Sequence, residues 1–167
     1  MITVISNGVD VSRTDYRGNT KYYVYDCDQT NLMARRNVLA ITNTLEKVWN
    51  YGYNADNLRI RSVSPLGQTN LFRYDERGNL LALTNALGQQ VASFAYTTNG
   101  LLASMTDARG NPTTFARNNE GLVTNAVDAL TNSWGQSFDG SGRLLCSLDP
   151  LGNATWLGYG TGDDKPT

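Results

Sequence analysis

Carboxylates are the first residues of this sequence that could do chemistry. Six aspartates recur along the 167 residues, at Asp15, Asp75, Asp107, Asp128, Asp139 and Asp149. Two carboxylates about 5 to 10 Å apart can hydrolyse a glycosidic bond, so a glycosidase is one function to weigh. Each aspartate, however, stands three residues before a glycine or its substitute, which is the pattern of a tight turn. The simpler interpretation is that these aspartates form turns, and we predict no catalytic residue.

Other catalytic and ion-binding groups are scarce. The chain has no His, which is the commonest general base and the commonest metal ligand. Ser141 lacks the full G-x-S-x-G pattern of a serine nucleophile. The stretch Asp26-x-Asp28-x-Thr30 resembles the start of a calcium loop, but Asn31 replaces its glycine and Asn37 its bidentate glutamate. We therefore predict no metal site, no cofactor and no enzymatic activity.

The charge balance also excludes several partners. Fourteen Lys and Arg residues stand against 15 Asp and Glu residues, so the formal net charge is −1. A chain that binds nucleic acid needs a basic stripe, and this sequence offers none. No apolar run approaches the ~20 residues of a membrane-spanning helix, so membrane insertion is not expected. The first residues, MITVISN, lack the features of a signal peptide, so any export signal must lie outside this chain.

The turn residues recur in a fixed register. One slot, which is usually Gly, recurs every 21 or 22 residues after a first step of 28, at Gly8, Arg36, Asn57, Gly78, Gly100, Gly121 and Gly142. Seven residues beyond it stands a short turn-forming residue: Asp15, Asn43, Ser64, Asn85, Asp107, Asp128 and Asp149. A second, mostly Gly slot follows three residues later, at Gly18, Glu46, Gly67, Gly88, Gly110, Thr131 and Gly152. Each unit of about 21 residues therefore contains two reversals of direction.

Short strands fit between these turns. The segments hold about six residues, which is strand length and too short for a stable helix. Leu80 and Leu83 are three residues apart, and we attribute that spacing to a β-bulge or to burial on both faces. Before the first slot of each following unit, two aromatic positions lie two residues apart on one strand face. They form a stripe of Tyr23, Tyr25, Tyr51, Tyr53, Phe72, Tyr74, Phe94, Tyr96, Phe115, Phe138 and Tyr159. The sequence predicts an all-β array of about seven hairpin units over residues 1–159, followed by residues 160–167 as a loop or a further unit.

The pattern Phe138-Asp139-x-x-Gly142-x-Leu144, followed by Asp149-Pro150-Leu151-Gly152-Asn153, resembles the RHS (rearrangement hot spot) or YD-repeat family. This resemblance implies tandem β-hairpins stacked into a curved sheet, as a segment of a spiralling hollow shell. Similar proteins include polymorphic toxins, insecticidal toxin complexes and teneurins. It further implies a secreted or cell-surface bacterial protein whose neighbouring repeats enclose a C-terminal toxin or effector. One hairpin cannot bury its own apolar face, so stacked hairpins supply the core and the terminal units need caps. This chain shows no atypical, polar terminal repeat, so we expect a fragment of a longer protein.

Two questions stay open at this level. The family pattern is broken by Arg117 in an aromatic slot and by Glu46, Thr131, Arg36 and Asn57 in glycine slots, which leaves the local turn geometry uncertain. The aromatic stripe has two interpretations, because rings in one slot of stacked hairpins can pack on one another as a ladder. Exposed aromatics can also bind sugars, so the alternative function is a surface carbohydrate-binding or adhesion module. Cys146, inside an apolar run, is expected to be a small buried residue.

Overall fold

The computed structural model describes residues 2–5, 10–26 and 37–159, and the chain divides into two compact units between Gln90 and Val91. The first unit holds eight strands: β1 (Ile2–Ile5), β2 (Asp10–Thr14), β3 (Thr20–Tyr25), β4 (Val38–Thr42), β5 (Val48–Tyr53), β6 (Arg59–Val63), β7 (Thr69–Tyr74) and β8 (Leu80–Thr84). The second begins with β9 (Gln90–Tyr96) and continues through β10 (Leu102–Asp107), β11 (Pro112–Arg117), β12 (Val123–Val127), β13 (Ser133–Phe138), β14 (Leu144–Leu148) and β15 (Ala154–Trp156).

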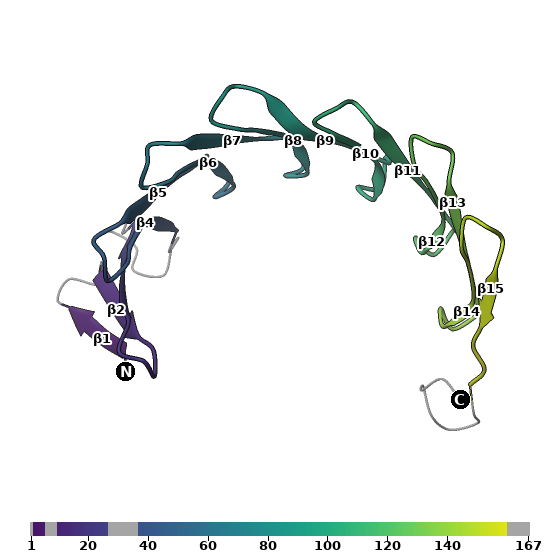
Figure 1. The fold of residues 1–167 in the computed structure, drawn as a ribbon, viewed down its shortest axis with the longest axis horizontal. Coiled ribbons are helices and arrows are strands. Elements are labelled where there is room, and N and C mark those ends of the chain that lie inside the picture. The colour runs from purple at the N-terminus through teal and green to yellow at the C-terminus, as the bar shows by residue number, and fades with distance from the viewer. Residues whose placement is uncertain (1, 6–9, 27–36, 160–167) are drawn as a thin grey trace. The chain divides into compact units, whose positions relative to one another are not determined.

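Each unit is a meander in which every strand pairs antiparallel with the strand next to it in the chain (Figure 1). The same pairing runs from β9 to β15 in the second unit. No helix occurs among the described residues. The predicted all-β fold of stacked hairpins is confirmed. The boundary between an array over 1–159 and a segment over 160–167 stays a prediction, because residues 160–167 lie outside the described part.

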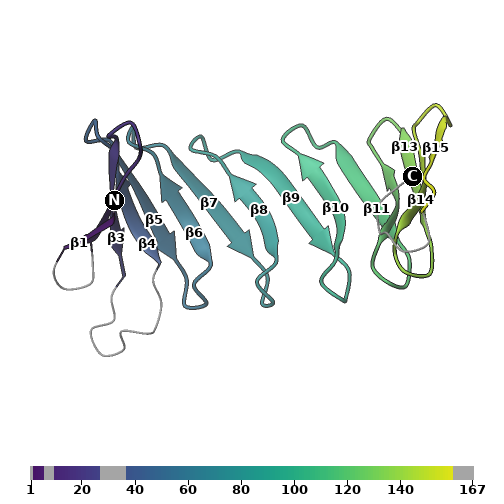
Figure 2. The ribbon, with the colours of Figure 1, turned by 90° about the horizontal axis from the view of Figure 1, so that it is seen from below.

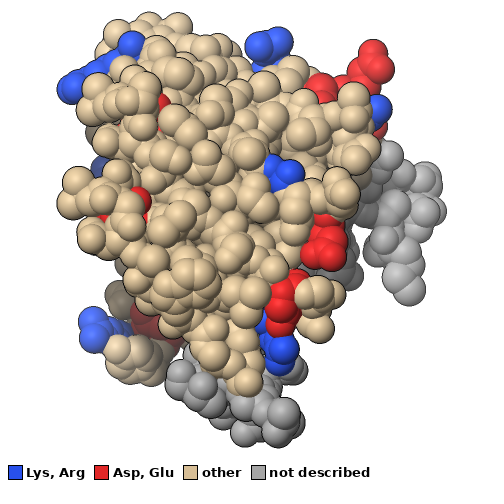
Figure 3. Space-filling model, turned by 90° about the vertical axis from the view of Figure 1, so that its right-hand side faces the viewer, with Lys and Arg blue, Asp and Glu red and all other residues tan. Residues whose placement is uncertain are grey.

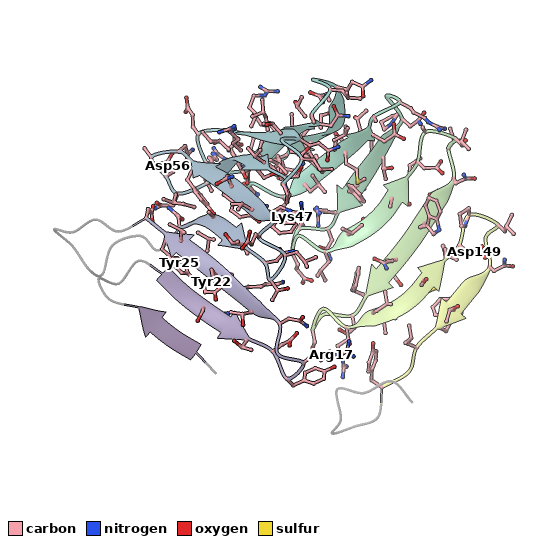
Figure 4. All side chains as sticks on the ribbon, turned by 60° about the vertical axis from the view of Figure 1, so that its left-hand side comes forward. Arg17, Tyr22, Tyr25, Lys47, Asp56 and Asp149 are labelled. Carbon is pink, nitrogen blue, oxygen red and sulfur yellow. The ribbon has the colours of Figure 1, made fainter. Side chains whose placement is uncertain are left out.

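The turns alternate between the two ends of the strands, so each unit has two edges made of turns (Figure 2). One edge, which we call the bulge edge, carries the turns at 54–58, 75–79, 97–101, 118–122 and 139–143 and the connection from Asp26 to Asn37. The other, the leucine edge, carries the turns at 15–19, 43–47, 64–68, 85–89, 107–111, 128–132 and 149–153. Figure 4 shows Asp56 and Lys47, one from each edge, at opposite ends of the strands of the first unit.

A β-bulge recurs beside the bulge edge. Tyr74 pairs with Leu80 and Arg73 with Ala82, so Leu81 is an extra residue in β8. The second residue of β4, β6, β10, β12 and β14 is extra in the same way: Leu39, Ile60, Ala103, Thr124 and Leu145. The bulge offsets the alternation of faces by one residue, which accounts for the spacing of Leu80 and Leu83.

The sheet of each unit is a single layer with very little core. The apolar residues that are buried within the described part are Ala82, 4% exposed, and Cys146, 6% exposed. Both are the third residue of their strand, directly after the bulge, so Cys146 is the small buried residue that the sequence predicts. The connectivity explains the shallow burial, because a meander brings strand beside strand and lays no second layer on either face.

Candidate functional site

The recurring aspartates each close a turn with their own carboxylate. In the first turn, Asp15 Oδ1 accepts hydrogen bonds from the backbone N–H groups of Arg17 and Asn19, at 2.8 and 3.0 Å. The Asn19 side-chain amide donates to the other carboxylate oxygen at 3.0 Å. The backbone adds two bonds, from Asp15 N to Asn19 O and from Gly18 N to Asp15 O. Both carboxylate oxygens are therefore engaged within five residues of chain.

The same clamp recurs along both edges. Asp75, Asp107, Asp128 and Asp149 bind the backbone in this way and accept side-chain bonds from Asn79, Asn111, Asn132 and Asn153. Asp139 uses Arg143 instead, in an ion pair of 2.7 Å between Oδ2 and Nε. Asn85 forms a neutral version, with its own amide donating to Gln89 Oε1 at 3.1 Å. The sequence shows that a long polar residue or Asn follows the second glycine slot, but not that it clamps the turn.

These hydrogen bonds hold the pKa of all six aspartates below the ordinary value. For five of them the largest cause is the side-chain bond from the Asn four residues later, and backbone bonds from the turn add to it. For Asp139 the backbone N–H of Arg143 lowers the pKa most, followed by its guanidinium. Donors stabilise the charged form, so these carboxylates are ionised at neutral pH. A general acid needs a raised pKa, which is the opposite shift.

The broken glycine slots keep the turn geometry. Glu46, Asn57 and Thr131 have φ angles of 58°, 62° and 67°, which are in the left-handed region that glycine adopts without strain. Each still donates its N–H to the residue three positions earlier, at 3.0 to 3.1 Å. Arg36 lies outside the described residues. Glu46, Asn57 and Thr131 therefore leave their turns unchanged, although they are not glycine and have a left-handed backbone.

The glycine slots of the two edges differ in their surroundings, although the described ones with glycine all have positive φ. At the bulge edge, a Cβ added to Gly121 would lie 3.1 Å from Leu101 Cδ1, and one added to Gly78 would lie 3.4 Å from Leu58 Cδ1. A Cβ added to Gly142 would lie 3.6 Å from Leu122 Cδ1. At the leucine edge, a Cβ on Gly18, Gly67, Gly88, Gly110 or Gly152 would meet nothing within 4 Å. Neighbouring turns therefore pack on one another at the bulge edge and stand apart at the leucine edge. Gly100, the remaining predicted glycine of the bulge edge, has a φ of 79° and donates its N–H to Thr97 O at 2.9 Å.

In three hairpin repeats, the tyrosine of the second aromatic slot binds the bulge of the preceding hairpin. The hydroxyl of Tyr53 donates to Val38 O at 3.0 Å, that of Tyr74 to Arg59 O at 2.9 Å and that of Tyr159 to Leu144 O at 2.9 Å. The three acceptors are the first residues of bulged strands, where the bulge interrupts the ladder. Burial raises the pKa of Tyr53, so its hydroxyl stays protonated as a donor.

Arg117 occupies this slot in another hairpin repeat and also donates to a bulge carbonyl. Its Nε and Nη2 donate to Leu102 O at 3.2 and 3.1 Å, and its Nη1 donates to Gly121 O at 2.8 Å. The acceptor lies 15 residues earlier, as it does for the tyrosines. Arg117 breaks the aromatic pattern, but it preserves the contact with the bulge.

The aromatic stripe is half-buried and lies on one face of each unit. Cross-strand pairs interleave its rings with other side chains: Phe72 pairs with Leu83, Phe94 with Met105 and Phe115 with Ala126. The aromatic slots of successive hairpin repeats are two strands apart, or roughly 9.6 Å. Their rings therefore do not stack directly on one another in the way that the ladder interpretation expects. The ring pair that the described residues show, Tyr23 and Tyr25 at 6.4 Å between centroids, lies within one strand.

Arginines fill part of this interleaved face. The Arg59 guanidinium lies 5.5 Å from the Tyr51 ring centre and 5.0 Å from that of Phe72, and so links two neighbouring hairpins of the first unit. Arg143 lies 4.7 Å from the Tyr159 ring centre. Arg59 is exposed, but this cation–π contact adds a structural role to the solvated charge that the sequence suggests. Tyr22 and Tyr25 show how β3 directs side chains to its two faces (Figure 4).

No metal site emerges from the described residues. Among them, no group of three or more His, Cys, Asp or Glu side chains could hold a metal ion. Asp26 is bound by the backbone N–H and the amide of Asn37 at 2.7 and 3.1 Å, and the rest of the calcium-like stretch lies outside the described part. The Ser141 N–H donates to Asp139 Oδ1 at 2.9 Å, so Ser141 belongs to a turn. On the face drawn in Figure 3, charged side chains are scattered and mixed in sign.

No helix in the described part of the chain has the length and apolar character needed to cross a membrane. This finding concerns helices alone.

Comparison with known proteins supports the repeat assignment. Residues 53–90 and 74–112 match the RHS Repeat family. The chain resembles crystal structures of TcdB2-TccC3-Cdc42 and of TcdB2-TccC3, each with a TM-score of 0.58, at 12% and 13% identity over 84% of this chain and 8% of those chains. It also resembles a Tc holotoxin pore from Photorhabdus luminescens, with a TM-score of 0.55 and 12% identity over 90% of this chain and 8% of that chain. No curated protein sequence matches significantly.

These likenesses show the fold, and this chain spans less than a tenth of the length of those structures. The family match covers residues 53–112, and the same clamps and bulges continue before and after that stretch. The recurring turns, the bulged hairpins and the family match lead to one conclusion, which is that residues 53–112 are RHS, or YD, repeats and that the strands before and after them continue the same hairpin architecture.

Proposed function

We propose that this chain is a non-catalytic wall segment of a longer, secreted or surface-exposed RHS protein that encloses or presents a C-terminal toxin or effector. The observation that carries the proposal is that the reactive side chains bind the chain's own backbone. The six recurring aspartates hold turns, and the hydroxyls of Tyr53, Tyr74 and Tyr159 donate to bulge carbonyls. These carboxylates and hydroxyls stabilise the sheet, so they are not available to bind or activate a substrate.

The similar structures support the enclosing role by analogy of fold. The names TcdB2-TccC3 and Tc holotoxin belong to toxin assemblies, and this chain covers 8% of each matched chain. A piece of that relative size fits one stretch of a wall. The single-layer sheet agrees with this, because both its faces are free to line an inside and an outside.

Protease protection tests the proposal in the full-length protein. The C-terminal segment should resist a protease that digests it once the repeat region is unfolded by urea. Rapid cleavage of that segment in the native protein would contradict an enclosing wall. Hydrolytic activity of the present chain that disappears with Asp149→Asn would contradict its non-catalytic role.

The carbohydrate-binding alternative gains no support from the site. The hydroxyls of Tyr53, Tyr74 and Tyr159 donate to the chain's own backbone and are not available to a sugar. Trp134 and Trp156 remain 41% and 75% exposed, but they lie on opposite faces of the sheet, since Trp134 pairs with Ala126 and Trp156 with Cys146. Saturable glycan binding that is lost in Trp134→Ala or Trp156→Ala would reopen this alternative.

A further inference from the structure

A hollow of about 290 Å³ lies on the face of the first unit that carries the aromatic stripe. Its lining comes from β3, β4, β5 and the turn at 43–47: Lys21, Ile41, Asn43, Trp49 and Tyr51. Trp49 pairs with Ile41 across the strands, and Tyr51 follows two residues later on the same face, so two half-buried rings form an apolar wall. The Arg59 guanidinium contacts the Tyr51 ring at 5.5 Å from its centre. The wall is therefore formed by the fold itself.

The hairpin fold does not require these side chains. Trp49 stands two residues before the first aromatic slot, and the same position in the other described hairpins holds side chains of several kinds: Lys21, Asn70, Ala92, Thr113 and Trp134. Lys21 and Trp49 therefore occupy the same position of successive hairpins, with Ile41 on the strand between them. Within the described part, no other two successive hairpins combine a lysine with a tryptophan in this way. The hollow is specific to one place in the array.

The turn beside the hollow contains an amide donor that has no acceptor in its own turn. Asn43 Oδ1 accepts the backbone N–H groups of Leu45 and Lys47 at 3.0 and 2.9 Å, which leaves the Asn43 amide nitrogen to donate elsewhere. The other turns of the leucine edge pair an acceptor with a donor at these two positions, as Asn85 does with Gln89. Lys47 stands there instead, and an ammonium group can only donate. Asn43 and Lys47 thus need an acceptor from outside the turn.

The charges around the hollow favour an anion. Lys21 and Lys47 are exposed, and neither forms an ion pair within the part of the chain that the structure describes. Asp15 interacts with Lys21 electrostatically, but its two oxygens already accept hydrogen bonds from Arg17 and Asn19. The polar groups that line the hollow or adjoin it through Asn43 are therefore mainly donors, and two of them are positively charged.

The size and the lining together define the class of ligand. A water molecule takes about 30 Å³ of liquid, so the hollow has room for a molecule of roughly 10 to 15 non-hydrogen atoms. An aromatic body packs well on the rings of Trp49 and Tyr51. A carboxylate accepts hydrogen bonds without donating any, which matches the Asn43 amide and the Lys21 ammonium group.

We infer that this hollow binds a small aromatic carboxylate, with the ligand ring against Trp49 and Tyr51 and the carboxylate bound by Asn43 Nδ2 and Lys21 Nζ. This site goes beyond the proposed wall function, which needs no ligand. A molecule bound on one face leaves the pairing between strands intact, so the two functions are compatible.

A fluorescence titration with 3-phenylpropionate tests the inference. Trp134→Phe and Trp156→Phe leave Trp49 as the sole tryptophan of the chain, so its emission reports on the hollow. The probe should change this emission saturably, with a Kd on the order of 1 mM for a ligand of this size. The uncharged 3-phenylpropionamide should bind at least about tenfold more weakly, because it lacks the charge-assisted bonds. Absence of saturation, or equal binding of the amide, would overturn the inference.

Three variants in the same background locate the carboxylate. Lys21→Met should weaken binding about tenfold, since it removes a charged donor. Lys47→Gln should also weaken it, because glutamine offers the Asn43 amide an acceptor, as Gln89 does for Asn85. Arg61→Met is the matched control: it removes a cation from the opposite face of the first unit and should leave the Kd unchanged.

Circular dichroism and the urea midpoint establish that each variant is folded. If folded Lys21→Met binds the probe as tightly as Arg61→Met does, the carboxylate is not bound at this hollow and the inference fails. The outcome is independent of the protease-protection experiment, so a failure of the binding site is distinguishable from a failure of the enclosing wall.

Discussion

Phe138→Tyr should stabilise the second unit, because Phe138 occupies the slot from which other hairpin repeats bind a bulge carbonyl. Tyr159 and Arg117 of the same unit donate to carbonyls 15 residues earlier, at Leu144 and Leu102. The carbonyl that corresponds to Phe138 belongs to Val123, the first residue of bulged β12. Phenylalanine lacks the hydroxyl for this bond, and tyrosine supplies it on a ring that is already half-buried.

The expected gain in stability follows from the equivalent hydrogen bonds in the other hairpin repeats. Their lengths of 2.9 to 3.2 Å are ordinary for hydrogen bonds to a carbonyl. One such bond contributes about 0.5 to 1.5 kcal/mol of net stability. A change of about 1 kcal/mol raises the Tm of a chain of this size by roughly 2 to 4 °C. Tyr159→Phe should produce a loss of similar size, because it deletes the bond to the Leu144 carbonyl.

Urea unfolding followed by tryptophan fluorescence measures this change. Trp134 lies on β13 together with Phe138, so it reports on the second unit. Phe115→Tyr is the matched control, since it adds the same hydroxyl in the first aromatic slot, which faces no bulge carbonyl in the other units. If Phe138→Tyr gains no more stability than Phe115→Tyr, the hydroxyl-to-bulge bond does not stabilise the array.

Three further predictions concern the turns. Thr131→Gly should raise the free energy of unfolding by about 1 kcal/mol in a urea titration, because it relieves a β-branched residue at a φ of 67°; a loss would show that the strain is absent. Gly110→Ala and Gly121→Ala place alanine at nearly the same φ, 84° and 85°, and each should cost about 1 to 2 kcal/mol. Gly121→Ala should cost more by thermal denaturation, since its Cβ also approaches Leu101 at 3.1 Å, and equal costs would contradict packing between bulge-edge turns. Asp149 has a pKa below the ordinary 3.8, so its stabilisation is complete above that pH and is lost as the pH falls through the lowered value. Asp149→Asn should therefore weaken the dependence of Tm on pH below about 4, and an unchanged pH profile would exclude the carboxylate as a source of acid sensitivity.

The sequence predicts the local parts of this fold well because they depend on residues close together in the chain. Asp149, Gly152 and Asn153 lie within five residues, and their types are enough to indicate a turn. The contact between Arg117 and Leu102 could not be predicted in this way. It joins residues 15 apart through a bulge that offsets one strand, and neither residue type reveals that offset. Arg117 therefore looks like a break in the pattern although it keeps the contact.

The single-layer sheet and the difference between its two edges also could not be predicted from the sequence pattern. Leu66 and Leu87 are visible as a repeated slot, but a repeated leucine ordinarily indicates a core position. Their exposure of 82% and 80% follows from the position of the turn beyond the end of the sheet. Similarly, the rings of the aromatic stripe share a face, but the intervening strand, which the pattern of one hairpin does not show, keeps them apart.

A single-particle structure of the full-length protein would test the proposed wall most directly. We expect the strands of this chain to be lateral neighbours in a wall, with one face toward a cavity that holds density from the C-terminal part of the same polypeptide. A map in which these strands stand apart from other repeats, with both faces in solvent or around a bound small ligand, would contradict the proposal.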